Sequence, residues 1–422
     1  MEQKIYDEYV EILKEELLPA MGCTEPIAVA YAAAVAVQAL GEKPESVEVN
    51  VSANIIKNVK SVVVPCTGGL RGIGAAVCAG IVAGCPEKEL EILEEITGEQ
   101  KVEMKKMLDT MPMTIRESDK EYIFDIQIKA CAGGHSGYVE IAGFHTNVIC
   151  VKKDDEIIRE KAYEEQGSSC ATDRSLLTVE KIIEFADCVD VADVEEVLQR
   201  QIDYNWAIAE EGMTGNWGAA IGKTLMEAYG NSVHNRAKAM AAAGSDARMN
   251  GCELPVVINS GSGNQGMTTS LPVIVYAKEL NVPKEMMLRA LVVSNLITIH
   301  MKTGIGRLSA YCGAISAGCG AGAGICYLYG GRAYEISHVI VNAVAINSGV
   351  VCDGAKASCA AKIASAVEAG LLGLQMQKNG KQIYGGDGLV EKGVENTIRN
   401  IGELAKKGMR ETDKTIIQIM TR

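Results

Sequence analysis

The stretch from Leu308 to Gly330 reads LSAYCGAISAGCGAGAGICYLYG and contains no charged residue. It is long enough to cross a bilayer. It is built mainly from Ala, Gly, Ser and Cys rather than from Leu, Ile and Phe, so it would enter lipid only weakly. Small side chains also allow helices to approach one another closely. The stretch therefore predicts a tightly packed helix inside a large domain, and it argues against a membrane partner.

The same Ala- and Gly-rich composition continues from about Leu177 onward, where nearly all of the chain predicts helix. Aromatic residues make up only 5% of the sequence, so Ala, Val, Ile, Leu and Met must fill the core. Residues 2–20 carry apolar side chains at helical spacing, and a second helix is expected from about 25 to 40.

Residues from about 45 to 165 have a different pattern. Polar and apolar residues alternate in SVEVNVSANI (46–55), which is typical of a strand. Further strands are expected at 61–65, 121–130, 137–143 and 145–153, and helices at 68–84, 87–98 and 99–108. The predicted fold class is α+β, with a large, mainly α-helical domain (1–44 and 166–422) and a smaller α/β insert (45–165).

The net charge and the cysteine content indicate which partners the protein can bind and in which compartment it works. The chain has 41 Lys and Arg against 54 Asp and Glu, a net charge of −13, which makes nucleic acid a poor candidate partner. Its N-terminus is a charged amphipathic segment rather than a signal peptide. Fourteen cysteines without such a signal suggest the reducing cytoplasm, where most thiols are small core residues.

Two cysteines stand seven apart in CDGAKASC (352–359). On an unbroken helix they would lie about 10 Å apart, but Asp353-Gly354 is a turn signal. We therefore expect Cys352 in a loop and Cys359 in the second turn of the next helix, where the helix N-terminus and Lys356 would favour thiolate. Cys312 is a possible third ligand. No C-x-x-C occurs, and spacing alone favours buried thiols over a metal cluster.

Several motifs together resemble the L-cysteine desulfidase family, which is related to the α chain of iron–sulfur L-serine dehydratases. They are MGCTEPIA (21–28), NIIKN (54–58), SGSGNQG (260–266), YCGA (311–314), CDGAK (352–356) and GMRETDKTIIQIM (408–420). The resemblance implies a [4Fe–4S] cluster that leaves one iron open and is held by Cys312, Cys352 and Cys359. It also implies a catalytic Cys23 and the conversion of L-cysteine, through α,β-elimination and 2-aminoacrylate, to pyruvate, ammonia and hydrogen sulfide.

Other residues receive roles as hypotheses. Cys23 precedes a helix start, which would lower its pKa and make its thiolate a base, although it could equally be a capping-region thiol. The glycine-rich loop could bind the substrate carboxylate or be an ordinary polar turn. Its candidate residues, with two weaker ones from the NIIKN motif, are Ser260, Ser262, Asn264, Gln265, Lys57 and Asn58. His145 is an alternative base or a structural strand-end residue, and Cys66 stands where family members often have glycine.

Three alternative functions stay open. L-serine dehydration would use the same cluster, with the open iron binding a hydroxyl. A pyridoxal-phosphate lyase built around SGSGNQG would need a Schiff-base lysine, and because no local signature names one, pyridoxal phosphate is not expected. A redox sensor or iron–sulfur storage protein would use the thiols without turnover. The expected partner is a small amino-acid substrate, with a homo-oligomer possible.

Overall fold

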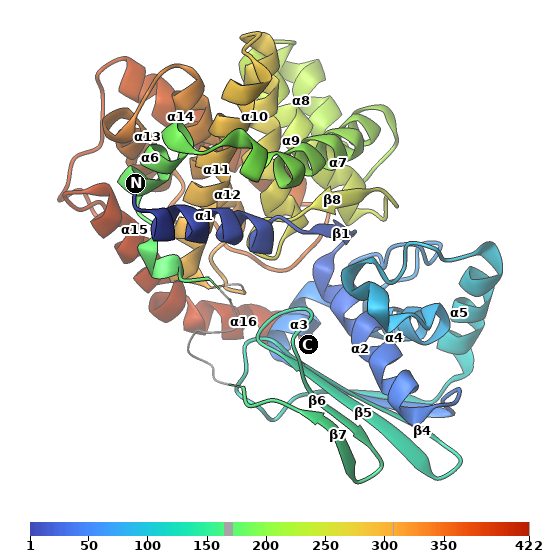
Figure 1. The fold of residues 1–422 in the computed structure, drawn as a ribbon. Helices are drawn as coiled ribbons and strands as arrows, with labels where there is room; N and C mark the ends of the chain where they lie inside the picture. The colour runs from blue at the N-terminus through green and yellow to red at the C-terminus, as the bar shows by residue number, and fades with distance from the viewer. Residues whose placement is uncertain (164–171, 307, 422) are drawn as a thin grey trace.

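The computed structural model describes residues 1–163, 172–306 and 308–421. It has a large helical part and a smaller part built on one sheet (Figure 1). The predicted fold class, mainly helical with a smaller α/β part, is therefore confirmed. The helices of the large part are α1 (Gln3–Glu16), α6 (Val179–Cys188), α7 (Glu195–Thr214), α8 (Ile221–Tyr229), α9 (Val233–Met249), α10 (Gly263–Glu279), α11 (Lys284–Ile305), α12 (Gly313–Leu328), α13 (Ala333–Ile346), α14 (Cys359–Lys378), α15 (Val394–Glu403) and α16 (Arg410–Thr421).

Helix α12 carries the uncharged stretch and packs against α10, α11, α13 and α14. Its glycines allow this close packing. A Cβ added at Gly318 would lie 2.3 Å from the Ala366 carbonyl oxygen of α14, and one added at Gly320 would lie 2.4 Å from the Ser294 carbonyl oxygen of α11. None of the helices over residues 1–163, 172–306 and 308–421 combines the length and the apolar character that crossing a bilayer requires.

Gly318→Ala is expected to lower the free energy of unfolding by about 1–3 kcal/mol, because its methyl group must push α14 away. Gly98→Ala is the matched control, since a Cβ at this first residue of α5 (Gly98–Thr110) meets no atom within 4 Å. Urea unfolding of both variants measures the difference. Equal stability of the two variants would show that the α12–α14 contact tolerates a side chain.

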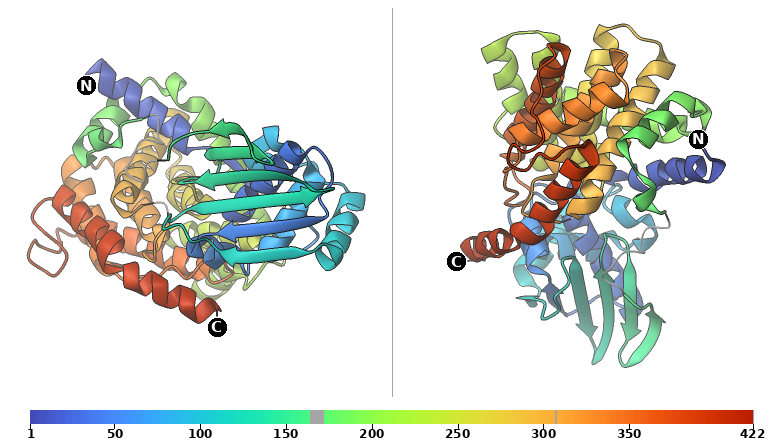
Figure 2. Two further views of the ribbon diagram at one scale, coloured as in Figure 1. Left: turned by 90° about the horizontal axis from the view of Figure 1, so that it is seen from below. Right: turned by 90° about the vertical axis from the view of Figure 1, so that its left-hand side faces the viewer.

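The smaller part contains a six-stranded sheet in the order β3-β2-β4-β5-β6-β7. Strands β2 and β3 are parallel, and the other neighbours are antiparallel. Helix α2 (Thr24–Leu40) packs on the sheet, and α4 (Gly72–Ala83) packs on α2. Seen from below, the strands form an open face of the molecule (Figure 2). The strands are β2 (Ser46–Val51), β3 (Met113–Glu117), β4 (Asp125–Ala132), β5 (His135–Ala142), β6 (Val148–Lys153) and β7 (Glu156–Glu160).

Two hydrophobic cores correspond to the two parts. The core of the smaller part includes α2, which the predicted boundary at residue 44 assigns to the helical domain. The domain boundaries as folding units remain a prediction. A short antiparallel ribbon of β1 (Pro19–Met21) and β8 (Pro255–Val257) holds the chain where it passes from one part to the other.

Several local predictions were wrong. Residues 61–65 form no strand and make only an isolated bridge between Val63 and Arg71. The second half of the predicted strand 46–55 begins a helix, α3 (Ala53–Val59). Residues 86–91 form a 3₁₀ helix instead of the start of a long α-helix. Each error concerns a short segment, for which periodicity is a weak guide to the type of secondary structure.

Candidate active site

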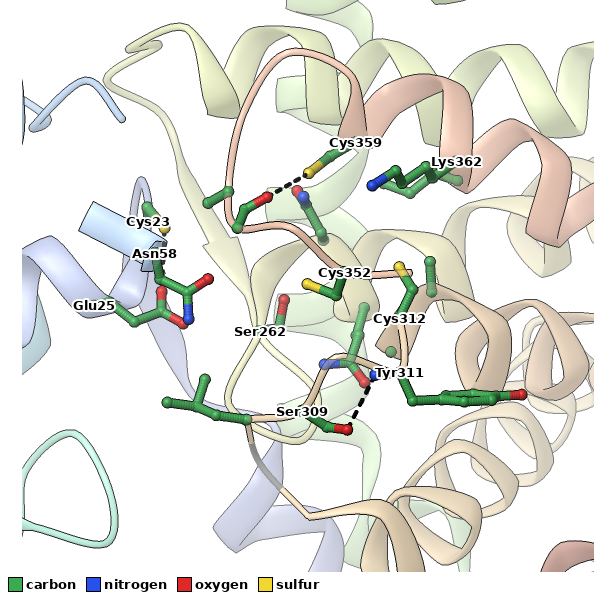
Figure 3. Close-up of a pocket in the computed structure, with 18 of the residues that line it drawn as sticks. Cys23, Glu25, Asn58, Ser262, Ser309, Tyr311, Cys312, Cys352, Cys359 and Lys362 are labelled. Carbon is green, nitrogen blue, oxygen red and sulfur yellow. Dashed lines mark hydrogen bonds between the residues drawn. The ribbon is translucent and has the colours of Figure 1, made fainter. Parts of the chain in front are cut away.

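Four cysteines line one pocket between the two parts of the molecule. The pocket encloses about 750 Å³ including its open mouth. Cys23 and Glu25 reach it from the start of α2, and Asn58 reaches it from α3. Cys312, Cys352 and Cys359 reach it from the helical part (Figure 3). The structure therefore brings together all four cysteines to which the resemblance gave a role.

Four helices begin at this pocket. The N-cap residues of α2, α10 and α12 are Cys23, Ser262 and Cys312, and α14 begins at Cys359. First-turn residues of all four helices line the pocket, and none of these N-termini has a side-chain capping hydrogen bond. A helix N-terminus carries unpaired N–H groups and the positive end of the helix dipole. The pocket is therefore suited to binding negative charge.

Backbone pairing places Cys312 beside Cys352. The Cys352 amide donates to the Ala310 carbonyl at 2.7 Å, and the Cys312 amide donates to the Val350 carbonyl at 3.1 Å. These bonds join two segments that stand 40 residues apart in the sequence. The two thiols are consequently neighbours, although no sequence spacing predicts it.

Gly354 makes the turn that brings Cys359 back to the pocket. Its φ is +95°, and a Cβ there would lie 2.4 Å from the Lys57 carbonyl oxygen. Cys352 lies in a loop, as expected, and the left-handed backbone of Gly354 is part of that loop. The expected position of Cys359 was wrong, because Cys359 is the first residue of α14 rather than part of its second turn. The reason is that residues 355–358 form a separate turn, so the helix begins later than its Ala-rich sequence suggests.

Electrostatics favour a thiolate at the Cys312–Cys352 pair. A hydrogen bond from Cys312 lowers the pKa of Cys352 to about 6, against the opposing effect of burial, and the charges of Lys57 and Lys362 act in the same direction. The same shared proton, together with burial, raises the pKa of Cys312. The cations that favour thiolate are thus Lys57 and Lys362. Lys356, which we expected in this role, forms an ion pair with Asp353, as Lys362 also does.

Cys312, Cys352 and Cys359 form a set of three thiol donors at one pocket. Among the residues that the structure describes, no three His, Cys, Asp or Glu side chains are arranged to hold one metal ion. Ligands of one ion must converge on a point, whereas each thiolate of an iron–sulfur cluster binds an iron of its own. Cys312, Cys352 and Cys359 share a pocket on which helix N-termini converge, and this donor set suits an anionic, thiolate-bound cluster.

The pKa of the Cys23 thiol is shifted in the direction opposite to the one we expected. Its pKa is raised well above the usual value, chiefly by burial and also by the Glu25 carboxylate. Cys23 is 2% exposed, and its Sγ donates a hydrogen bond to Glu25 Oε2 at 3.1 Å. The prediction of a lowered pKa was wrong, because desolvation and a neighbouring negative charge outweigh the helix dipole at this position.

The glycine-rich loop is divided between the pocket and the core. Ser262, Asn264 and Gln265 line the pocket at the start of α10, as does Asn58. Ser260 does not line it, because its φ of +51° turns the hydroxyl to donate to Asn259 Oδ1. Lys57 does not line the pocket either. Its Nζ forms a buried ion pair with Asp413 of α16 at 2.5 Å.

Two further residues singled out from the sequence, His145 and Cys66, also lie outside the pocket lining. His145 is buried, with its ring edge-on to Phe124 at 4.9 Å between centroids. Cys66 is buried with a φ of +58°, and burial raises the pKa of its thiol to about 11. Neither residue is placed to contact a molecule in this pocket.

Sequence reasoning missed four charged residues that line the pocket, Glu25, Arg248, Lys302 and Lys362. Glu25 lies inside the GCTEP motif and could have been considered for that reason. Arg248 gave no comparable signal, because nothing in the sequence around it distinguishes it from a surface arginine on a helix. In the structure Arg248 is 3% exposed and lines the pocket.

The chain is similar to known proteins along nearly all of its length. The serine dehydratase alpha chain family matches residues 87–418. A UPF0597 protein of Desulfitobacterium hafniense (strain Y51) is 59% identical, over 99% of this chain and 97% of the relative. UPF0597 proteins of Lachnoclostridium phytofermentans and Treponema denticola are 50% and 43% identical, each over at least 99% of both chains. The chain therefore belongs to the serine dehydratase alpha chain family.

Proposed function

We propose that this protein is an iron–sulfur-dependent lyase of the serine dehydratase type, and that it converts L-cysteine to pyruvate, ammonia and hydrogen sulfide. One observation carries the proposal. Three cysteines suited to a cluster share a pocket with a fourth thiol, Cys23, and four uncapped helix N-termini converge there.

Cys312, Cys352 and Cys359 would hold the cluster. Three protein ligands leave one of four irons open, and that iron, when bound, supplies a Lewis acid for the leaving sulfur of the substrate. The positive charges of Lys57 and Lys362 lie close enough to favour the thiolate form of Cys352, the form that binds iron.

Cys23 and Glu25 would carry out the proton transfer from the substrate Cα. Before Cys23 can act as a base, its thiol proton must leave, and Glu25 Oε2 already accepts a hydrogen bond from it. The Cys23 thiolate then takes the Cα proton, the C–H electron pair forms the Cα=Cβ bond, and the Cβ–S bond breaks with its pair on sulfur. The sulfur leaves as HS⁻ and takes up the proton held by Glu25, which gives hydrogen sulfide and restores both side chains. The other product, 2-aminoacrylate, is converted by water to pyruvate and ammonia.

L-serine is the second candidate substrate, and the family description favours it directly. Its elimination follows the same steps, with water leaving in place of hydrogen sulfide. Sulfur is the better leaving group and the softer ligand for iron, which is why we place L-cysteine first.

Anaerobic purification followed by parallel assays with L-cysteine and L-serine tests the proposal. A brown, air-sensitive protein that releases sulfide and pyruvate from L-cysteine is the expected result. Pyruvate from L-serine alone would reverse the order of the two substrates. A protein that carries iron but turns over neither amino acid would point to a redox or storage role, and a yellow, iron-free, active protein would point to pyridoxal phosphate.

A further inference from the structure

Arg248 is a buried cation at the pocket without an acidic partner. It lies in the last turn of α9, and no Asp or Glu of the described residues forms an ion pair with it within 4.0 Å. Its Nε donates to the Gly22 carbonyl at 2.7 Å, and its Nη1 donates to Asn264 Oδ1 at 3.1 Å. A buried charge that has only neutral partners is costly, so an arrangement of this kind calls for an anion.

The surroundings of Arg248 are built to hold its guanidinium at the start of α10. A Cβ added at Gly263 would lie 2.5 Å from Arg248 Nε, so only glycine allows this approach. The first turn of α10 lines the same pocket through Asn264 and Gln265, next to its N-cap Ser262. Gln265 is 6% exposed, and its Oε1 accepts no hydrogen bond from the described residues. The site thus joins a fixed cation and a helix N-terminus, which suit a carboxylate, with an unpaired acceptor oxygen, which suits a donor such as an ammonium group.

Arg248 also shares the pocket with the thiols of Cys23 and Cys359. Burial dominates the pKa of both Cys23 and Cys359, and the charge of Arg248 acts against burial on each. A ligand held by this guanidinium would therefore be close to the proposed base and to a proposed cluster ligand.

We propose that Arg248, with the first-turn amides of α10, binds the α-carboxylate of the substrate and so restricts the site to free α-amino acids. This inference rests on the proposed function for the identity of the reaction, but carboxylate binding itself needs no turnover. An arginine fork matches a carboxylate geometrically, and the loss of such a charge-assisted bond costs about 10- to 100-fold in affinity. An amide at this position, as in an N-terminal cysteine of a peptide, would forfeit the ion pair.

L-alanine and L-alaninamide form a matched pair of probes, because neither has a leaving group and only L-alanine has the carboxylate. Calorimetric titration of the anaerobically purified full chain should show tighter binding of L-alanine. Arg248→Gln should weaken the binding of L-alanine by about 10- to 100-fold, to the affinity of L-alaninamide, and should leave the affinity for L-alaninamide unchanged. Arg248→Lys should restore part of the preference.

Asn264→Asp provides a second variant if Arg248→Gln unfolds. It changes one atom and places a carboxylate beside Arg248 Nη1, so the guanidinium keeps its position but is neutralised internally. We expect it to lose the preference for L-alanine while retaining its melting temperature and iron content.

Equal weakening of both probes in Arg248→Gln, an unchanged preference in both variants, or no binding of L-alanine by the parent protein would overturn the inference. The proposed function fails separately. If L-cysteine yields no sulfide while L-alanine binding still depends on Arg248, only the reaction is wrong. If sulfide is released and the variants keep their preference, only the carboxylate assignment is wrong.

Discussion

Cys352→Ser is expected to abolish the release of sulfide from L-cysteine and to remove most of the iron from the anaerobically purified protein. The thiol of Cys352 has a pKa of about 6 and a hydrogen bond from Cys312, and it lies at the junction of two paired backbone segments. A serine hydroxyl stays protonated and is a hard ligand, so it cannot replace a thiolate on iron. Substitution of a residue that hydrogen-bonds to a metal ligand typically lowers metal affinity or activity by about 10- to 100-fold. Loss of the ligand itself should therefore lower kcat/KM by more than about 100-fold.

Cys188→Ser is the matched control for this experiment. Cys188 is an exposed thiol at the end of α6 and does not line the pocket. Its replacement should leave iron content and turnover unchanged. Iron content is measured by elemental analysis and the visible spectrum under argon. Full iron content in Cys352→Ser would remove Cys352 from the ligand set, even if the variant were inactive.

Cys23→Ser should lose turnover while keeping its iron. We expect kcat to fall by about 10²- to 10⁴-fold, the usual contribution of a positioned acid or base. The reason is that a hydroxyl does not give up its proton to Glu25 at neutral pH, so the serine Oγ cannot act as the base. Because Cys23 is not a proposed ligand, the colour and iron content of the protein should match those of the parent.

Cys66→Ser is the control here, since Cys66 is also a buried thiol of the N-terminal region but does not line the pocket. Parent-like turnover in Cys23→Ser would refute its role as base and direct attention to Glu25. Loss of iron together with turnover would instead place Cys23 among the groups that hold the cluster.

Helical elements followed from the sequence because they depend on local regularity. The Ala- and Gly-rich stretch at 308–330 predicted a close-packed helix, and α12 has that environment. Edge strands escaped prediction for an equally local reason. Strands β3 and β7 are five-residue edge strands that expose nearly all of their side chains, so burial against a core does not constrain the sequences MTIRE and EIIRE.

The site residues also fall into two groups, those that sequence motifs indicate and those that only the structure reveals. The resemblance named Cys23, Cys312, Cys352 and Cys359 from motifs, and all four line one pocket. No sequence pattern could show that Arg248 is buried without an acidic partner, or that burial would raise rather than lower the pKa of Cys23. Both properties depend on which distant segments exclude water from these side chains.

The sequence by itself thus determined the helical character of the large part, the presence of an α/β part and the candidate thiols. These depend on side-chain size, on periodicity and on motifs that are read along the chain. Only the tertiary structure decided that four helix N-termini meet at one pocket and that the segment 310–312 pairs with 350–352. Helix ends and buried charges acquire their energetic role from neighbours that are remote in sequence, so the electrostatics of the site exist only in the folded chain.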